Sequence, residues 1–150
     1  MRLICHRGGR GFGPDNTLRA MEEAARAGVG AIEIDVRCTA DGELVLSHDP
    51  EVGRLSIRKN PLARIREENP DVPLLREVME SLAGKILFDL EIKEAPPRKV
   101  VDLLDGYGML SRAVFTSFHE EVVDELKRAR PGAKGGPVRW TLLEENRLLH

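Results

Sequence analysis

The sequence predicts an α/β protein in which short strands form a parallel sheet. Apolar segments of a few residues alternate along the 150-residue chain with segments of about ten residues that show helical spacing. This alternation is typical of repeated β/α units, which build parallel sheets. The chain contains no linker, internal repeat or low-complexity segment, so a single domain is expected over residues 1–150.

The individual elements follow from hydrophobic periodicity and from the residues that interrupt it. Strands are expected at residues 2–5, 31–36, 44–46, 85–92, 113–116 and 138–142. Helices are expected at residues 16–27, 73–82, 98–104 and 120–129, with a single turn near 62–67 in an irregular, charged stretch (50–69) and another helix from 144 onward. Gly28 and Gly84 end the first two helices, and Asp41-Gly42 forms a turn before the third strand.

Composition excludes several classes of function. The formal net charge is −2, which gives no reason to expect a nucleic acid partner. Aromatic residues make up 4% of the chain, too few for a surface on which bases stack. No apolar run approaches the ~20 residues needed to cross a bilayer, and the N-terminus lacks the pattern of a secretion signal. We therefore expect a cytoplasmic protein without a membrane span.

Acidic residues interrupt two of the apolar strands. Side chains alternate along a strand, so Glu33 and Asp35 share one face, while the apolar residues between them face the helices. A later strand repeats the pattern with Asp89, Glu91 and Lys93. Burying uncompensated carboxylates costs several kcal/mol, so positive charge has to balance them. Either internal ion pairs fill this face, or a divalent cation that prefers oxygen ligands, Mg²⁺ or Ca²⁺, binds there.

Histidines directly follow two of the apolar strands. His6 follows the first strand and His48 the third, where ligands bind in parallel sheets. Either one alone would more simply be a structural histidine, but two can divide the acid and base roles near neutral pH. Asp49 either orients His48 or caps the next segment. Arg7 either contacts a phosphate through its planar guanidinium group or pairs with the acids.

An ordered set of short motifs then carries a resemblance to a known family. The motifs are His6-Arg7-Gly8, Pro14-Asp15-Asn16-Thr17, Glu33-Ile34-Asp35-Val36, Thr39-Ala40-Asp41-Gly42, Leu44-Val45-Leu46-Ser47-His48-Asp49, Val72-Pro73-Leu74-Leu75-Arg76-Glu77-Val78, Leu90-Glu91-Ile92-Lys93 and Ser117-Phe118. In this order, over about residues 1–130, they resemble the glycerophosphodiester phosphodiesterase family. No single motif is decisive, but the ordered set is highly specific.

The resemblance implies a TIM-type (β/α) barrel and the metal-dependent hydrolysis of a small-molecule glycerophosphodiester to sn-glycerol 3-phosphate and an alcohol. It implies one divalent cation, Mg²⁺ or Ca²⁺, as cofactor. The implied site residues are the general acid and base His6 and His48, the metal ligands Glu33, Asp35 and Glu91, and Arg7 and Lys93, which contact the phosphate or balance its charge.

Two features depart from the family's pattern. Asp15 stands where the family usually has a glutamate, so the charge is kept on a side chain one methylene shorter. The chain is also shorter than the ~200–250 residues that a complete (β/α)₈ barrel typically needs. We therefore expect a barrel truncated to about six β/α units, which resembles the first two thirds of the family's domain and is incomplete at the C-terminus. Open edges of such a sheet would favour a homo-oligomer.

Two other functions stay open on the sequence alone. One is a catalytically impaired family member that binds a metal or a partner, which the short C-terminal part suggests. The other is phospholipase D-like cleavage of lysophospholipids by the same acid–base pair. The chain shows no apolar loop suited to a membrane surface, which favours the water-soluble glycerophosphodiester as substrate.

Overall fold

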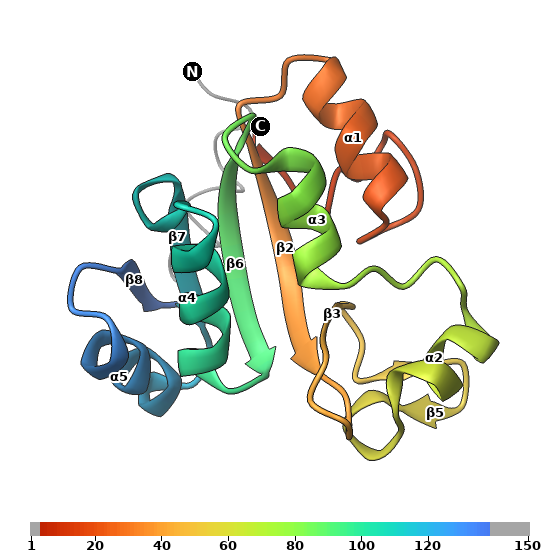
Figure 1. The fold of residues 1–150 in the computed structure, drawn as a ribbon. Coiled ribbons are helices and arrows are strands. Elements are labelled where there is room, and N and C mark those ends of the chain that lie inside the picture. The colour runs from red at the N-terminus through yellow and green to blue at the C-terminus, as the bar shows by residue number, and fades with distance from the viewer. Residues whose placement is uncertain (1–3, 139–150) are drawn as a thin grey trace.

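The computed structural model describes residues 4–138, and six strands of this part form one sheet (Figure 1). Five strands run parallel, in the order β1 (Ile4–Cys5), β2 (Ala31–Cys38), β6 (Leu87–Glu94), β7 (Ala113–Ser117) and β8 (Lys134–Pro137). The sixth, β3 (Leu44–Leu46), runs antiparallel to the end of β2. The carboxyl ends of β1, β2 and β6 therefore meet on one side of the molecule.

Helices follow the strands and pack on the sheet (Figure 1). They are α1 (Leu18–Arg26), α3 (Leu75–Leu82), α4 (Pro97–Gly106) and α5 (Glu120–Ala129), with a 3₁₀ turn, η2 (Leu110–Arg112), before β7. The Thr17 hydroxyl accepts a hydrogen bond of 3.3 Å from the Ala20 backbone N–H and so caps α1. No helix within the described residues combines the length and apolar character that crossing a membrane requires.

A small lobe lies between β3 and α3. It contains the hairpin strands β4 (Glu51–Val52) and β5 (Leu55–Ser56), the 3₁₀ turn η1 (Ile57–Lys59) and the helix α2 (Leu62–Glu68). Its buried residues pack with Val45 of β3 in a second core cluster, whose other members are Val52, Ile57, Ile65, Val72 and Leu74. The Asp41 side chain joins the lobe to the turn before β3, since its Oδ1 accepts the Leu62 N–H at 3.0 Å.

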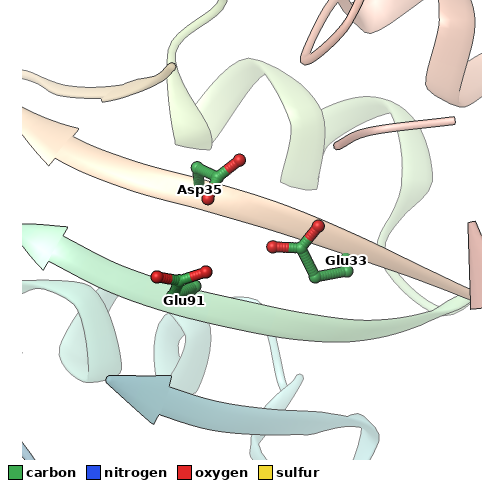
Figure 2. A group of neighbouring side chains, drawn as sticks. All are labelled: Glu33, Asp35 and Glu91. Carbon is green, nitrogen blue, oxygen red and sulfur yellow. The ribbon is translucent and has the colours of Figure 1, made fainter. Parts of the chain in front are cut away.

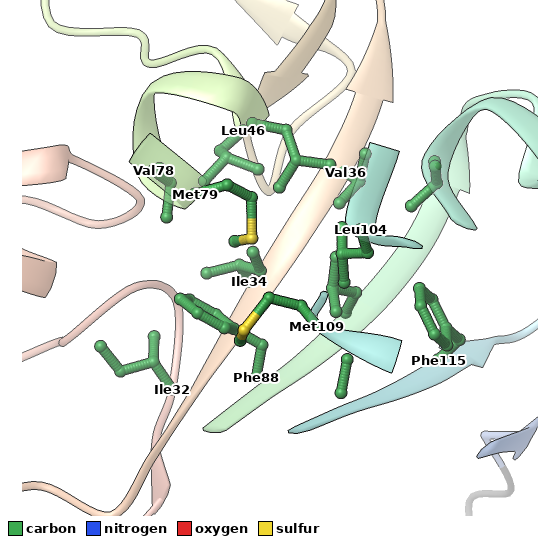
Figure 3. Packing of buried hydrophobic residues seen from close by; sticks show 14 of the residues in the cluster. Ile32, Ile34, Val36, Leu46, Val78, Met79, Phe88, Leu104, Met109 and Phe115 are labelled. Carbon is green, nitrogen blue, oxygen red and sulfur yellow. The ribbon is translucent and has the colours of Figure 1, made fainter. Parts of the chain in front are cut away.

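The main core lies on one face of β2 and β6 (Figure 3). The core residues of these two strands are Ile32, Ile34, Val36, Phe88, Leu90 and Ile92, each at most 2% exposed. They belong to one cluster with helix residues such as Val78, Met79 and Leu104. Because side chains alternate along a strand, the residues between them point to the opposite face. That face carries the charged side chains.

The expected α/β class is confirmed, but one strand direction and one irregular stretch differ from the prediction. β3 is antiparallel, so the described sheet does not consist of six parallel strands. The turn at Asp41-Gly42 returns the chain directly beside β2, and so short a connection permits only an antiparallel pair. The stretch at 50–69 contains the β4–β5 hairpin and the seven-residue helix α2 instead of a single helical turn.

The last described strand, β8, was not predicted from the sequence. A strand was expected at 138–142, whereas β8 spans Lys134–Pro137 and Val138 lies after it. Gly135 and Gly136 carry no apolar pattern, but backbone pairing with β7 needs none. A Cβ at Gly135 would collide with the Phe115 carbonyl oxygen, so this close pairing requires glycine. Residues 139–142, and the helix expected from 144 onward, lie outside the described residues.

Candidate active site

Three carboxylates from two adjacent strands converge on the charged face of the sheet (Figure 2). Glu33 and Asp35 lie on β2 and Glu91 lies on β6, where the parallel register pairs Asp35 with Glu91. One carboxylate oxygen of each lies within 4.8 Å of the others. The side chain of Asp35 is 1% exposed, that of Glu33 12% and that of Glu91 15%. The fold thus brings the three expected metal ligands into one nearly buried cluster.

Burial and mutual repulsion make this cluster electrostatically unfavourable. The pKa of Glu33 is raised from 4.5 to about 7, first because burial disfavours the charged carboxylate and second because Asp35 is negatively charged. The Arg7 backbone N–H, which donates to Glu33 Oε2 at 2.8 Å, acts in the opposite direction. Burial also raises the pKa of Asp89, the residue paired with Glu33 across the strands. The cluster therefore favours uptake of positive charge, as a proton or as a cation.

Lys93 places one positive charge beside the cluster. Its Nζ lies 3.1 Å from Glu91 Oε1 and 3.5 Å from Asp35 Oδ1. Both oxygens are buried, and neither receives a hydrogen bond from the described residues, because the ammonium group approaches them without hydrogen-bond geometry. Two buried carboxylate oxygens without a donor fit a metal ion. A set of oxygen ligands alone suits Mg²⁺ or Ca²⁺ rather than Zn²⁺.

Asn16 orients one of these carboxylates, a role that the sequence did not reveal. Its Nδ2 donates to Asp35 Oδ2 at 3.0 Å, and its Oδ1 accepts the Asp35 backbone N–H at 3.4 Å. Asn16 is 3% exposed and has a φ of 54°, a conformation that asparagine tolerates better than most residues. The available signal was an asparagine directly before the helix cap Thr17, but only the tertiary contact shows its partner.

His48 lies in the loop after β3, and both ring nitrogens have partners. Nδ1 lies 2.8 Å from Asp49 Oδ1, and Nε2 lies 3.1 Å from the Arg7 guanidinium group. A guanidinium group only donates, so Nε2 is the acceptor and Nδ1 carries the proton that Asp49 accepts. The same hydrogen bond lowers the pKa of Asp49. Of the two roles considered for Asp49, the geometry therefore supports the orientation of His48.

His6 lies beside the acidic cluster, in the loop after β1. Its Nδ1 is 3.8 Å from Glu33 Oε2, and its side chain is 71% exposed. The next residue, Arg7, donates its backbone N–H to that same oxygen and extends its side chain to His48. Arg7 has a φ of 49°, which is uncommon outside glycine. Glu33 therefore lies beside His6 and accepts the Arg7 N–H, while the Arg7 side chain contacts His48. Glu33 and Arg7 thus link the two expected catalytic histidines.

A cleft of about 280 Å³ opens beside Arg7 and His48. Its polar lining includes Asp15, whose carboxylate lies 3.4 Å from the Arg7 guanidinium group, and Asp49. Arg7 therefore pairs with an acid while its side chain remains 33% exposed. Lys93 contacts Asp35 and Glu91 of the acidic cluster, whereas the Arg7 guanidinium group pairs with Asp15, outside that cluster. The cleft has room for a small polar molecule next to Arg7 and His48.

The family model that describes the Glycerophosphoryl diester phosphodiesterase family matches residues 6–127. The chain belongs to this family. The matched range contains both histidines, the three carboxylates and the two cations of the site. The family thus agrees with the one that the ordered motifs resemble.

Relatives in the glycerophosphodiester phosphodiesterase family confirm the fold. Glycerophosphodiester phosphodiesterase 1 from Rattus norvegicus is 38% identical over 148 residues, covering 83% of this chain and 45% of the relative. A glycerophosphodiester phosphodiesterase structure from Agrobacterium tumefaciens aligns with a TM-score of 0.81 at 29% identity, covering 89% of this chain and 65% of that one. A phosphodiesterase from Oleispira antarctica, in complex with the product sn-glycerol-3-phosphate, aligns at 0.79 and 26% identity, covering 91% and 65%. The expected TIM-type (β/α) class is confirmed, and the chain spans about half the length of the curated relatives it matches.

Proposed function

We propose that this chain hydrolyses glycerophosphodiesters to sn-glycerol 3-phosphate and an alcohol. The observation that carries the proposal is the convergence of Glu33, Asp35 and Glu91 beside His6, with Arg7 linking Glu33 to His48. Membership of the glycerophosphoryl diester phosphodiesterase family supports it, as does the relative with sn-glycerol-3-phosphate bound.

Glu33, Asp35 and Glu91 would hold one divalent cation, Mg²⁺ or Ca²⁺. The buried and undonated oxygens Asp35 Oδ1 and Glu91 Oε1 support this role, as does the raised pKa of Glu33. When bound, such a cation would stabilise negative charge on the phosphoryl oxygens. Asn16 would keep the Asp35 carboxylate in the orientation needed for binding.

His6 and His48 would share the proton transfers. One imidazole takes the proton of the attacking hydroxyl or water, and the other returns a proton to the leaving alcohol. The hydrogen bond from His48 Nδ1 to Asp49 fixes the ring and directs Nε2 toward Arg7, at the edge of the cleft. Because the His6 ring is exposed, it is accessible to a substrate entering from solvent.

Arg7 would contact the phosphate, and Lys93 would balance charge. Arg7 is a third exposed and lines the cleft, so its guanidinium group can exchange Asp15 for a phosphate oxygen. Lys93 is 17% exposed and contacts two carboxylates, which supports a role in limiting their repulsion. The cytoplasmic location and self-association through the sheet edges remain predictions, the latter to be tested by sedimentation velocity.

The test is release of sn-glycerol 3-phosphate from glycerophosphocholine, measured with Mg²⁺, with Ca²⁺ and with a chelator. We expect release with a cation and none with the chelator, and a loss of about 10²–10⁴-fold in His48→Asn. His119→Asn is the matched control, because the His119 side chain is exposed and its ring contacts Glu121 of α5 rather than a residue of the proposed site. Folded protein without turnover under any divalent cation would refute the proposal.

Cation binding and a second substrate, measured beside this assay, separate the two alternatives. An impaired family member would bind the cation in calorimetry but release no glycerol 3-phosphate. A phospholipase D-like enzyme would cleave lysophosphatidylcholine readily and glycerophosphocholine poorly. Either result would replace the proposed activity.

A further inference from the structure

We propose that Arg37 is a positioning residue that holds the loop carrying His48 in its active arrangement. The inference rests on the proposed function for its catalytic consequence, but its structural content does not depend on turnover. Arg37 lies on β2, two residues beyond Asp35, and belongs to neither the acidic cluster nor the histidine pair. No sequence motif distinguishes it from the other arginines of the chain.

The Arg37 side chain is buried. Alternation along β2 places residue 37 on the same face as Glu33 and Asp35. The Arg37 side chain is 8% exposed, and arginine is almost never so deeply buried unless its donors are paired. Its guanidinium group must therefore have fixed partners.

Two of those partners are carbonyl groups in the loop that follows β3 and carries His48. Arg37 Nε donates to the Ser47 carbonyl at 3.1 Å, and a terminal nitrogen donates to the His48 carbonyl at 2.7 Å. The other terminal nitrogen donates to Glu94 Oε1 at 3.0 Å. The planar guanidinium group has donors on several edges, so it can bind two successive carbonyls and a carboxylate at once. A lysine ammonium group cannot reproduce this planar geometry.

The strand register explains how Arg37 is anchored. The pairing of β2 with β6 shifts between Val36 and Arg37, so that Arg37 faces Glu94 instead of Lys93. This irregularity leaves Lys93 for the acidic cluster and gives the guanidinium group a carboxylate on its other side. The Glu94 side chain is 45% exposed, so this ion pair contributes little by itself. The two loop carbonyls are the distinctive contacts.

A backbone N–H of the same loop is also hydrogen-bonded to β2. The Ser47 N–H donates to the Asp35 carbonyl at 3.1 Å, so β2 holds Ser47 through both its N–H and its carbonyl. His48 follows directly, with its ring between Asp49 and Arg7. Removing Arg37 would leave two carbonyls without this donor, and the loop would turn to satisfy them elsewhere. The imidazole would then lose its place relative to Asp49 and Arg7.

Arg37→Met tests this role with two measurements on the full chain. Imidazole ¹⁵N chemical shifts of His48, assigned with His48→Asn, report the tautomer; we expect the Nδ1–H form in the unchanged protein and a mixture in Arg37→Met. In the glycerophosphocholine assay, we expect kcat to fall about 10- to 100-fold with KM unchanged, because a catalytic group is misplaced while phosphate binding is kept. Arg37→Lys keeps the charge and should restore only part of both signals.

Val101→Ala is the control for lost stability. Val101 is fully buried in α4, on the face of the sheet opposite the site, so this variant melts earlier without touching the loop. It should leave the His48 tautomer and kcat unchanged. A folded Arg37→Met with an unchanged His48 spectrum and kcat would overturn the proposal, and so would equal changes in Val101→Ala. If Arg37→Met does not fold, a wild-type His48 spectrum in Arg37→Lys would overturn it. Absence of turnover in the unchanged protein would count against the proposed function alone, since the spectra still decide the role of Arg37.

Discussion

On one face of β2 and β6, apolar side chains pack beneath the helices; on the other face of the same strands, four charged side chains lie in contact. Ile34 and Asp35 are neighbours in sequence, yet one is part of the core and the other part of the acidic cluster. The first face contributes stability through apolar burial. The second face lowers stability, as the raised pKa of Glu33 indicates. The same face brings together carboxylates that can bind a cation. The strands β2 and β6 thus carry residues that stabilise the fold on one face and residues of the candidate site on the other.

The largest expected effect comes from the apolar face. Phe88 is 2% exposed in the core cluster, so Phe88→Ala should lower the free energy of unfolding by about 3–5 kcal/mol. Urea denaturation at pH 7 would measure it. Cation affinity of the molecules that remain folded should be unchanged, because no charged side chain is removed. A loss as small as that of an ordinary surface substitution would show that the helices do not depend on this face.

The next effect comes from Glu33 and has the opposite sign. The folded protein keeps the Glu33 proton to about pH 7, whereas the unfolded chain releases it near 4.5. Between these values the folded state binds more protons, so this group lowers stability as pH rises from about 4.5 to 7. Without added cation, Glu33→Gln should therefore be more stable at pH 8 by an amount on the order of 3 kcal/mol.

Urea denaturation from pH 4 to 8 measures this slope. The matched control is Glu125→Gln, since Glu125 is an exposed residue of α5. It should leave the pH dependence of stability unchanged. If Glu33→Gln shows the same pH dependence as the unchanged protein, the acidic face does not oppose folding as described.

A smaller effect is expected from Asn16, which touches the charged face without carrying charge. Asn16→Ala removes both hydrogen bonds to Asp35 and should weaken Mg²⁺ or Ca²⁺ binding by about 10- to 100-fold. Asn60→Ala is a suitable control, because the Asn60 amide donates to the Ser56 carbonyl in the lobe. Isothermal titration calorimetry on both variants would measure the change. Equal affinities in the two variants would mean that Asp35 needs no support from Asn16.

The sequence predicted the charged face well because strand alternation is a local rule. Glu33, Asp35 and Glu91 could be placed together from their spacing within two strands and from the family resemblance. Asn16 and Arg37 could not, because hydrogen-bond partners on other segments leave no mark in the periodicity of the strand or helix start that carries each residue. The β8 strand was not predicted for a related reason, since Gly135 fits β7 through its backbone while carrying no apolar signal. Local periodicity identifies which face a residue occupies, but not which distant backbone it binds.

The most direct test of the central claim is calorimetric titration of Mg²⁺ and Ca²⁺ into the unchanged protein and into Glu91→Gln at pH 8. This pH lies above the pKa of Glu33, about 7, so Glu33 is available to bind a cation. We expect one cation per chain in the unchanged protein and clearly weaker binding in Glu91→Gln, which keeps its shape but loses one converging charge. Equal affinity in the two proteins, or no binding of either cation, would contradict the assignment of this face as a metal site.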